Sequence, residues 1–247
     1  MKMGWSGLES AGKSQLMAVF AYKIYRRNCA WIKRREKKGL PFVPRIMAFD
    51  SPMSPEFIFR IESKGMKYIL FYDLNDIMPL SEIDIFINEI NKFFPSRGSD
   101  SLTREQAEFL SQGAKDGVDI YFCSQDFSQA HKQFRFLVNK MFHVAKVFGS
   151  RRPVKSAPPI SFIWGLVLYW SIDPASFKGD SISMKSTGFN RILPSFYFLN
   201  KKDTMLYDTS YKVRGSKLPP IKMIEQEYLY YSDTGAIIKR LKKWSKR

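Results

Sequence analysis

A loop motif near the start of the chain constrains the fold more than any other feature. Residues 7–14 read Gly-Leu-Glu-Ser-Ala-Gly-Lys-Ser and fit the P-loop pattern G-x-x-x-x-G-K-[ST]. Gly7 and Gly12 allow backbone conformations that a Cβ excludes, so backbone N–H groups can curl around a phosphate. Lys13 can reach the outer phosphates, and Ser14 can offer a hydroxyl to Mg²⁺. The motif predicts a strand, a phosphate-binding loop and a helix whose positive end faces the anion.

We assign this loop to nucleotide binding, with ATP as the ligand and Mg²⁺ as its ion. The alternative is an ordinary glycine turn before a helix, and the alternation of strands and helices after the motif argues against it. The predicted contact set is Gly7, Ser10, Ala11, Gly12, Lys13, Ser14 and Gln15.

Apolar runs alternate with helix-like segments after the loop. Residues 15–38 have apolar side chains at helical spacing, and Gly39 and Pro41 end that pattern. Further helices are predicted over 103–115, where Thr103 and Gln106 fit a capping box, and over 128–135. The predicted strands cover residues 1–6, 44–50, 67–72, 83–89 and 118–124, and residues 51–55 are predicted as a turn. This alternation predicts an α/β fold of the P-loop NTPase, RecA-like class, with a mainly parallel sheet flanked by helices.

The second part of the chain has a different composition. Residues 150–159 are rich in Pro and Ser and suggest a boundary, so we divide the chain into a P-loop domain at 1–150 and a basic, β-rich extension at 151–247. Aromatic and β-branched runs at 162–169, 196–199 and 205–213 predict strands in the extension. The extension ends in a basic amphipathic tail over 237–247. The apolar run 160–172 contains two serines and is too short to span a membrane as a helix.

The charge balance points to a polyanionic partner. The chain has 40 Lys and Arg against 23 Asp and Glu, a formal net charge of +17, and no acidic residue between Phe127 and Ile172. This composition favours either nucleic acid or an anionic membrane surface. The aromatic residues among these charges are candidates for stacking on unpaired bases, and a place in the core is the alternative for each: Phe134, Phe136, Phe142 and Trp244. Cys29 and Cys123 lie in apolar stretches without metal-ligand spacing, which favours a reducing compartment.

Hydrolysis of ATP needs acidic or polar groups at a strand end beside the loop. The best candidate is the end of the predicted strand 83–89. Glu89 can act as the base that activates water, although it could also be an ordinary strand-end glutamate. Asn88 occupies the place expected for a Mg²⁺-side aspartate, so its amide is predicted to contact the ion directly or through water and to slow hydrolysis.

The order of further motifs resembles the zonular occludens toxin (Zot) domain family. The elements are Glu89 at a strand end, Pro95-Ser96-Arg97, and a strand ending in Ser124-Gln125. This family comprises P-loop ATPases of filamentous-phage assembly, distantly similar to DNA-pumping ATPases of the FtsK and HerA type. The resemblance covers residues 4–150 and implies that Gln125 senses the γ-phosphate or its water.

Two arginines are candidates for a finger given to a neighbouring subunit. The resemblance implies this role for Arg97 and Arg135, and surface salt bridges are the alternative for each. Many relatives have an arginine before the Gly-x-Asp turn, where this chain has Ala114-Lys115, and many continue into a transmembrane helix that this chain lacks.

These features predict an ATP-binding, ATP-hydrolysing phage morphogenesis protein that packages or translocates viral DNA. We expect a homo-oligomer, with a hexameric ring as one form, in the host cytoplasm or peripheral at the inner membrane. The alternative is a weakly hydrolysing nucleotide-binding scaffold that docks on membrane or coat proteins. A small-molecule kinase is disfavoured because the sequence has no lid or acceptor-binding motif.

Overall fold

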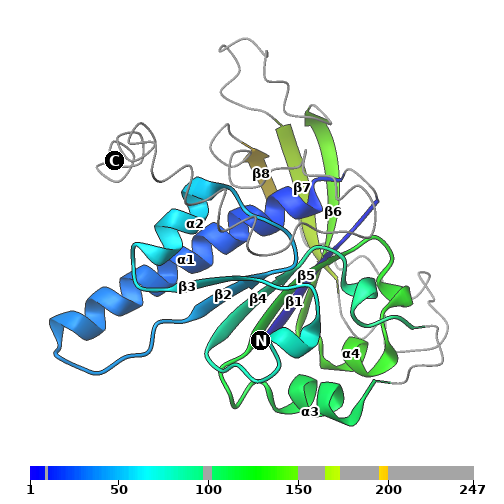
Figure 1. Ribbon diagram of the computed structural model, residues 1–247. Helices are drawn as coiled ribbons and strands as arrows, with labels where there is room; N and C mark the ends of the chain where they lie inside the picture. Colours follow the sequence, from blue (N-terminus) through cyan, green and yellow to red (C-terminus); the bar gives the residue numbers. More distant parts are fainter. Residues whose placement is uncertain (9–10, 97–101, 150–164, 173–194, 200–247) are drawn as a thin grey trace.

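One eight-stranded sheet with helices on both faces forms the described part of the molecule (Figure 1). The computed structural model describes residues 1–8, 11–96, 102–149, 165–172 and 195–199. The strands are β1 Lys2–Ser6, β2 Ile46–Phe49, β3 Lys67–Leu70, β4 Ile83–Ile87, β5 Asp119–Ser124, β6 Lys140–Gly149, β7 Gly165–Ile172 and β8 Ser195–Leu199. The helices are α1 Lys13–Lys37, α2 Pro55–Glu62, α3 Arg104–Gln112 and α4 Lys132–Leu137, with short 3₁₀ turns at Leu74–Asp76, Ile90–Lys92 and Phe127–Gln129.

The strand order is β3-β2-β4-β5-β1-β6-β7-β8. The first six strands in this order pair in parallel, whereas β7 and β8 join the edge by antiparallel pairing. Parallel strands end at the same edge of a sheet, and that edge is where ligands bind in open α/β folds. This is the α/β P-loop NTPase fold predicted from the sequence.

The two faces of the sheet bury separate apolar cores. Along β4, Phe86 packs on the side of α1 and α2, while Ile85 and Ile87 pack on the side of α3 and α4 (Figure 1). All five β4 residues are buried, Asp84 among them, which explains why apolar residues stand on both faces of the strand and do not alternate with exposed polar ones.

A charged cluster joins the starts of three strands, at the edge opposite the loop. The Arg45 guanidinium donates to Glu82 at 2.8 Å and to Asp84 at 3.0 Å, and it reaches Asp119 at 3.4 Å. Asp84 is fully buried and also accepts a hydrogen bond from Asn28 at 3.0 Å. These contacts fix the amino ends of β4 and β5 beside Arg45, which directly precedes β2.

Most predicted elements are present, and three local predictions were wrong or incomplete. Residues 51–55 were predicted as a simple turn, but Pro55 opens α2, which the sequence analysis did not predict. The helix predicted over 128–135 is a 3₁₀ turn followed by α4, because Ala130 is extended (φ −78°, ψ 148°). Strand β6 was not predicted, although it pairs with β1 directly beside the loop.

The predicted extension contributes β7 and β8 to the same sheet. β6 pairs with β7, and β7 with β8, so these strands continue the edge that begins at β1. The domain boundary at residue 150, the predicted strand in 205–213 and the tail at 237–247 lie outside the described residues, and the division into 1–150 and 151–247 stays a prediction.

Candidate nucleotide-binding and hydrolysis site

The loop between β1 and α1 has the backbone of a phosphate cradle. Gly12 has φ 87° and caps α1, and Gly7 has φ 153°. A Cβ on Gly7 would lie 2.4 Å from the carbonyl oxygen of Val144 on β6, closer than real Cβ contacts allow. Glycine is therefore required at residue 7 by both its conformation and its close approach to β6.

Lys13 is held inside this cradle. Its ammonium donates to the carbonyl oxygens of Gly7 and Leu8, each at 2.7 Å, and only 8% of the residue is exposed. The first turn of α1 has no acidic residue, and its N-cap makes no side-chain hydrogen bond. A long helix with an uncompensated positive end and a buried ammonium beside it suit a polyphosphate.

The other predicted contact residues lie along the same loop and helix start. Ala11 is buried, and Ser14 and Gln15 are half-buried in the first turn of α1. The buried Oε1 of Gln15 has no hydrogen-bond partner among the residues that the structure describes. Ser10 lies outside the described residues, so its contact with nucleotide stays a prediction.

Glu89 follows β4 and faces the loop across β5. Two strand spacings separate β4 from β1, roughly 10 Å, which leaves room for a phosphate and a water between them. Its Oε1 is buried without a hydrogen-bond partner among the described residues. Burial raises the pKa of the Glu89 carboxyl, while the Gln125 backbone N–H, Lys13 and Lys92 oppose that shift. A carboxylate with a raised pKa suits a proton acceptor.

Gln125 lies between the loop and Glu89. It directly follows β5, the strand that pairs with β1, and its side chain is exposed at the edge where β1 ends. Its backbone N–H is the donor that acts on the Glu89 carboxylate. The structure thus brings Gln125, Glu89 and Lys13 to one edge of the sheet.

Asn88 belongs to a hydrogen-bonded group that includes Asp50, a residue the sequence analysis missed. The Asn88 backbone N–H donates to Asp50 Oδ2 at 2.8 Å, and Ser51 Oγ donates to Asp50 Oδ1 at 3.0 Å. The Asn88 side-chain amide donates to Ser51 Oγ at 3.0 Å. Burial raises the pKa of Asp50 to about 6, although these donors oppose the shift.

Asp50 contacts the chain at Asn88, directly before Glu89. It follows β2, three strand spacings from β1, so roughly 14 Å separates it from the loop strand and excludes direct contact with an ion held there. The signal that could have found it is a carboxylate after a buried strand, at the edge where Glu89 also lies.

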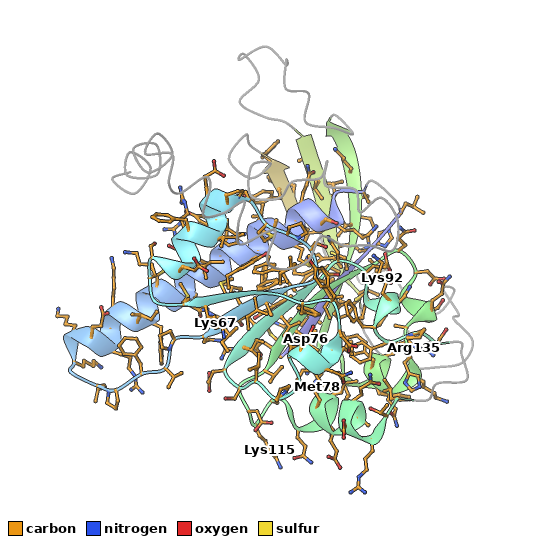
Figure 2. The ribbon with its side chains drawn as sticks, viewed as in Figure 1. Lys67, Asp76, Met78, Lys92, Lys115 and Arg135 are labelled. Atoms are coloured by element: carbon orange, nitrogen blue, oxygen red, sulfur yellow. The ribbon has the colours of Figure 1, made fainter. Side chains whose placement is uncertain are left out.

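The structure describes one of the two arginine-finger candidates. Arg135 lies on α4 and is 7% exposed, and Figure 2 shows it on the α4 side of the sheet. A finger on this residue therefore requires that α4 turn its guanidinium outward at a subunit contact. Arg97 lies outside the described residues, and its role stays a prediction.

Comparison with known proteins finds similar solved structures. The N-terminal domain of zonular occludens toxin from Neisseria meningitidis shares 16% identity over 84% of this chain and 98% of that chain, with a TM-score of 0.46. The genome packaging NTPase B204 from Sulfolobus turreted icosahedral virus 2, solved with ATP-gammaS, shares 13% identity over 69% of this chain and 91% of that chain, with a TM-score of 0.37. The flagellar accessory protein FlaH from Methanocaldococcus jannaschii shares 13% identity over 72% of this chain and 80% of that chain, with a TM-score of 0.41.

No protein-family model matches the sequence, and no curated protein matches it significantly. The fold assignment rests on this chain's own strand order and on the geometry of the described loop residues, which are 7, 8 and 11–14.

The residues at this edge fit a nucleotide better than a protein-only metal site. Within the described ranges, no group of three or more His, Cys, Asp or Glu side chains could hold a metal ion. Mg²⁺ commonly takes few protein ligands and completes its shell with phosphate oxygens and water. The roles of Ser14 and Asn88 as Mg²⁺ ligands stay predictions.

Proposed function

We propose that this protein binds and hydrolyses ATP and uses the energy to package or translocate viral DNA. The observation that supports hydrolysis best is the half-buried Glu89 carboxylate, two strands from the P-loop, with one oxygen lacking a hydrogen-bond partner among the described residues. A carboxylate in that place can accept a proton from water that attacks the γ-phosphate.

Each residue of the site has a distinct part in this proposal. Lys13 exchanges its two loop carbonyls for phosphate oxygens, which are stronger partners because they are charged. Ser14 and Asn88 would hold Mg²⁺, which would neutralise charge on the phosphates. Glu89 takes the proton of the attacking water, and the Gln125 amide orients that water or reads the γ-phosphate.

Two substitutions test this assignment. Lys13→Ala should abolish tight ATP binding, whereas Glu89→Gln should retain binding and lose turnover by at least about a hundredfold. Glu62→Gln, an exposed change on α2, serves as the matched control and should leave both unchanged. Equal turnover in the wild type and Glu89→Gln would remove Glu89 from the mechanism.

DNA is the polyanion that we assign to the basic surface. The exposed basic residues of α1 are Lys23, Arg26, Arg27, Lys33, Arg34 and Lys37. Duplex binding should weaken with salt at a slope of about −0.9 per phosphate neutralised, and the paired change Lys33→Ala and Arg34→Ala should reduce that slope by about 2. The Zot resemblance of the sequence supports the viral setting, in the host cytoplasm or at the inner membrane. No helix among the described residues is long and apolar enough to span a bilayer.

A scaffold is the second candidate function, favoured by Asn88. An amide supplies an oxygen without negative charge, and this weakens Mg²⁺ binding relative to a carboxylate. A scaffold would bind ATP, turn it over slowly with or without DNA, and dock on coat or membrane proteins. ATP turnover that single- or double-stranded DNA accelerates would exclude it, while absence of DNA binding at low salt would exclude translocation.

In an oligomer, an arginine from a neighbouring subunit would complete the hydrolysis site. We propose Arg97 or Arg135 as that residue, because a guanidinium can brace transition-state charge with two hydrogen bonds. Mixing Lys13→Ala subunits with Arg135→Ala or Arg97→Ala subunits should restore part of the hydrolysis. Full activity in a strictly monomeric protein would contradict this.

A further inference from the structure

Strands β6 and β7 flank the P-loop on the side away from Glu89. The Val144 carbonyl of β6 lies against Gly7, and a Cβ on Gly12 would lie 3.1 Å from Val167 Cγ2 of β7. The groups assigned to hydrolysis come from β4 and β5, on the other side of β1. A nucleotide whose γ-phosphate points toward β5 therefore has its ribose and base on the β6 side.

An aromatic pair stands on those two strands. His143 is paired in register with Ser6, the residue before the loop, and with Trp170 on β7. The rings of His143 and Trp170 are 4.8 Å apart between centroids and inclined by 47°, and both residues are half-buried. Burial, together with the positive charge of Lys13, lowers the pKa of His143.

This pair lies on the face of the strands that α1 does not cover. Val144, Val167 and Tyr169 pack on the α1 side, and side chains alternate along a strand, so His143 and Trp170 point to the opposite side. On that side Phe196 and Phe198 of β8 are 64% and 46% exposed. The two phenylalanines leave apolar surface exposed on the same face as the pair.

The separation also suits a nucleotide. From β1 across β6 to β7 is two strand spacings, roughly 10 Å, which an α-phosphate and a ribose can bridge. No acidic residue lies between Phe127 and Ile172, so the sequence places no negative charge on β6 or β7 to repel the phosphates.

We propose that His143 and Trp170 form a stacking platform for the base of the nucleotide whose phosphates the P-loop holds. The proposal rests on nucleotide binding at the P-loop, as proposed above. Every base has a π-face, so the platform favours nucleotides over bare polyphosphates more than it selects among purines.

The test compares ATP with tripolyphosphate, which has the phosphates and no base. Binding of each with Mg²⁺ is measured by isothermal titration calorimetry. Trp170→Ala should raise the Kd for ATP by about 5- to 150-fold and leave the Kd for tripolyphosphate within about twofold. His143→Ala should also raise the Kd for ATP and not that for tripolyphosphate. Trp170→Phe should retain most of the wild-type affinity for ATP. Trp31→Phe, at a 40% exposed site on α1, is the matched control and should change neither Kd.

A second measurement does not depend on truncated variants. ATP should quench a part of the tryptophan emission that is absent in Trp170→Phe, and tripolyphosphate should not quench it. An equal loss of affinity for ATP and for tripolyphosphate in Trp170→Ala would overturn the platform. Quenching by ATP that is the same in Trp170→Phe as in the wild type would also overturn it. Failure of the wild type to bind either ligand would instead overturn nucleotide binding, and the platform with it.

Discussion

Replacing Asp50 by asparagine should make the protein's stability less dependent on pH. Burial raises the pKa of Asp50 to about 6, well above the value of about 3.9 for an unfolded chain. The folded state therefore holds the proton more tightly than the unfolded state. The tighter proton binding stabilises the folded state, and this stabilisation is fully present below pH 4 and is lost as pH rises through 6.

The size of the effect follows from the two pKa values. With about 6 in the folded state and about 3.9 in the unfolded state, the wild type loses about 2 kcal/mol of unfolding free energy between pH 4 and pH 7 through this group alone. The asparagine of the variant would not titrate, but its amide would turn an N–H₂ toward one donor, at a cost of about 1–3 kcal/mol at every pH. That cost cancels when the two pH values are compared.

The assay is urea unfolding followed by tryptophan fluorescence at pH 4, 5, 6 and 7, with EDTA and without nucleotide. Between pH 4 and pH 7, the unfolding free energy of the variant should rise by about 2 kcal/mol relative to that of the wild type. Asp116→Asn, at an exposed carboxylate, is the control and should follow the wild type. A stability difference between Asp50→Asn and the wild type that is the same at pH 4 and pH 7 would refute the reasoning.

Two further predictions concern the ion and the sheet. Asn88→Asp should raise Mg²⁺-dependent ATP turnover if the missing charge limits it, and no change or a fall in a steady-state assay would show that the site is built around the amide. Arg45→Met should cost about 3 kcal/mol because fully buried Asp84 loses its ion pair, and this lowers the Tm by roughly 6–12 °C in a calorimetric scan. Arg104→Met, which breaks an exposed pair with Glu108, is the control, and a Tm as low as that of Arg45→Met would contradict the argument.

The elements that the sequence predicted correctly have local signals. The capping box is present as predicted, with Gln106 N–H donating to Thr103 Oγ1 and Thr103 N–H to Gln106 Oε1, both at 3.2 Å. The strands at 83–87 and 119–124 carry apolar residues on both faces because both faces are buried, and their polar members are Asp84, Asp119 and Ser124. In these cases the physical cause acts over a few residues, so the sequence alone reveals it.

Helix α2 was missed although its start signals are local. Ser54 caps the helix, accepting a hydrogen bond from Phe57 N–H at 3.4 Å, and Pro55 occupies the first helical position. Pro at that position and Ser before it are a known helix start. The two prolines of the segment were instead interpreted as a turn, so the error lay in the interpretation and not in the sequence.

Strand β6 and the role of Asp50 could not be predicted in the same way. β6 pairs with β1, more than a hundred residues earlier in the chain, and Lys140, His143 and Lys146 interrupt its apolar residues. Asp50 is near Glu89 only because β2 is the neighbour of β4, which follows from the order of strands across the sheet. Contacts of this kind depend on topology, which periodicity does not reveal.

The aromatic residues considered for base stacking show how burial changes such an interpretation. Phe134 is fully buried and stacks on Phe94 at 5.0 Å, so its π-face is not available to DNA. Phe136, two residues later, is 47% exposed, and Trp244 lies outside the described residues. Stacking on a single strand needs a free π-face beside a basic group, and Phe136 has exposed Lys132 one helical turn before it on α4. Among the three phenylalanines considered, Phe136 is therefore the one to which a stacking role can still be assigned, since Phe142 is half-buried against Tyr169.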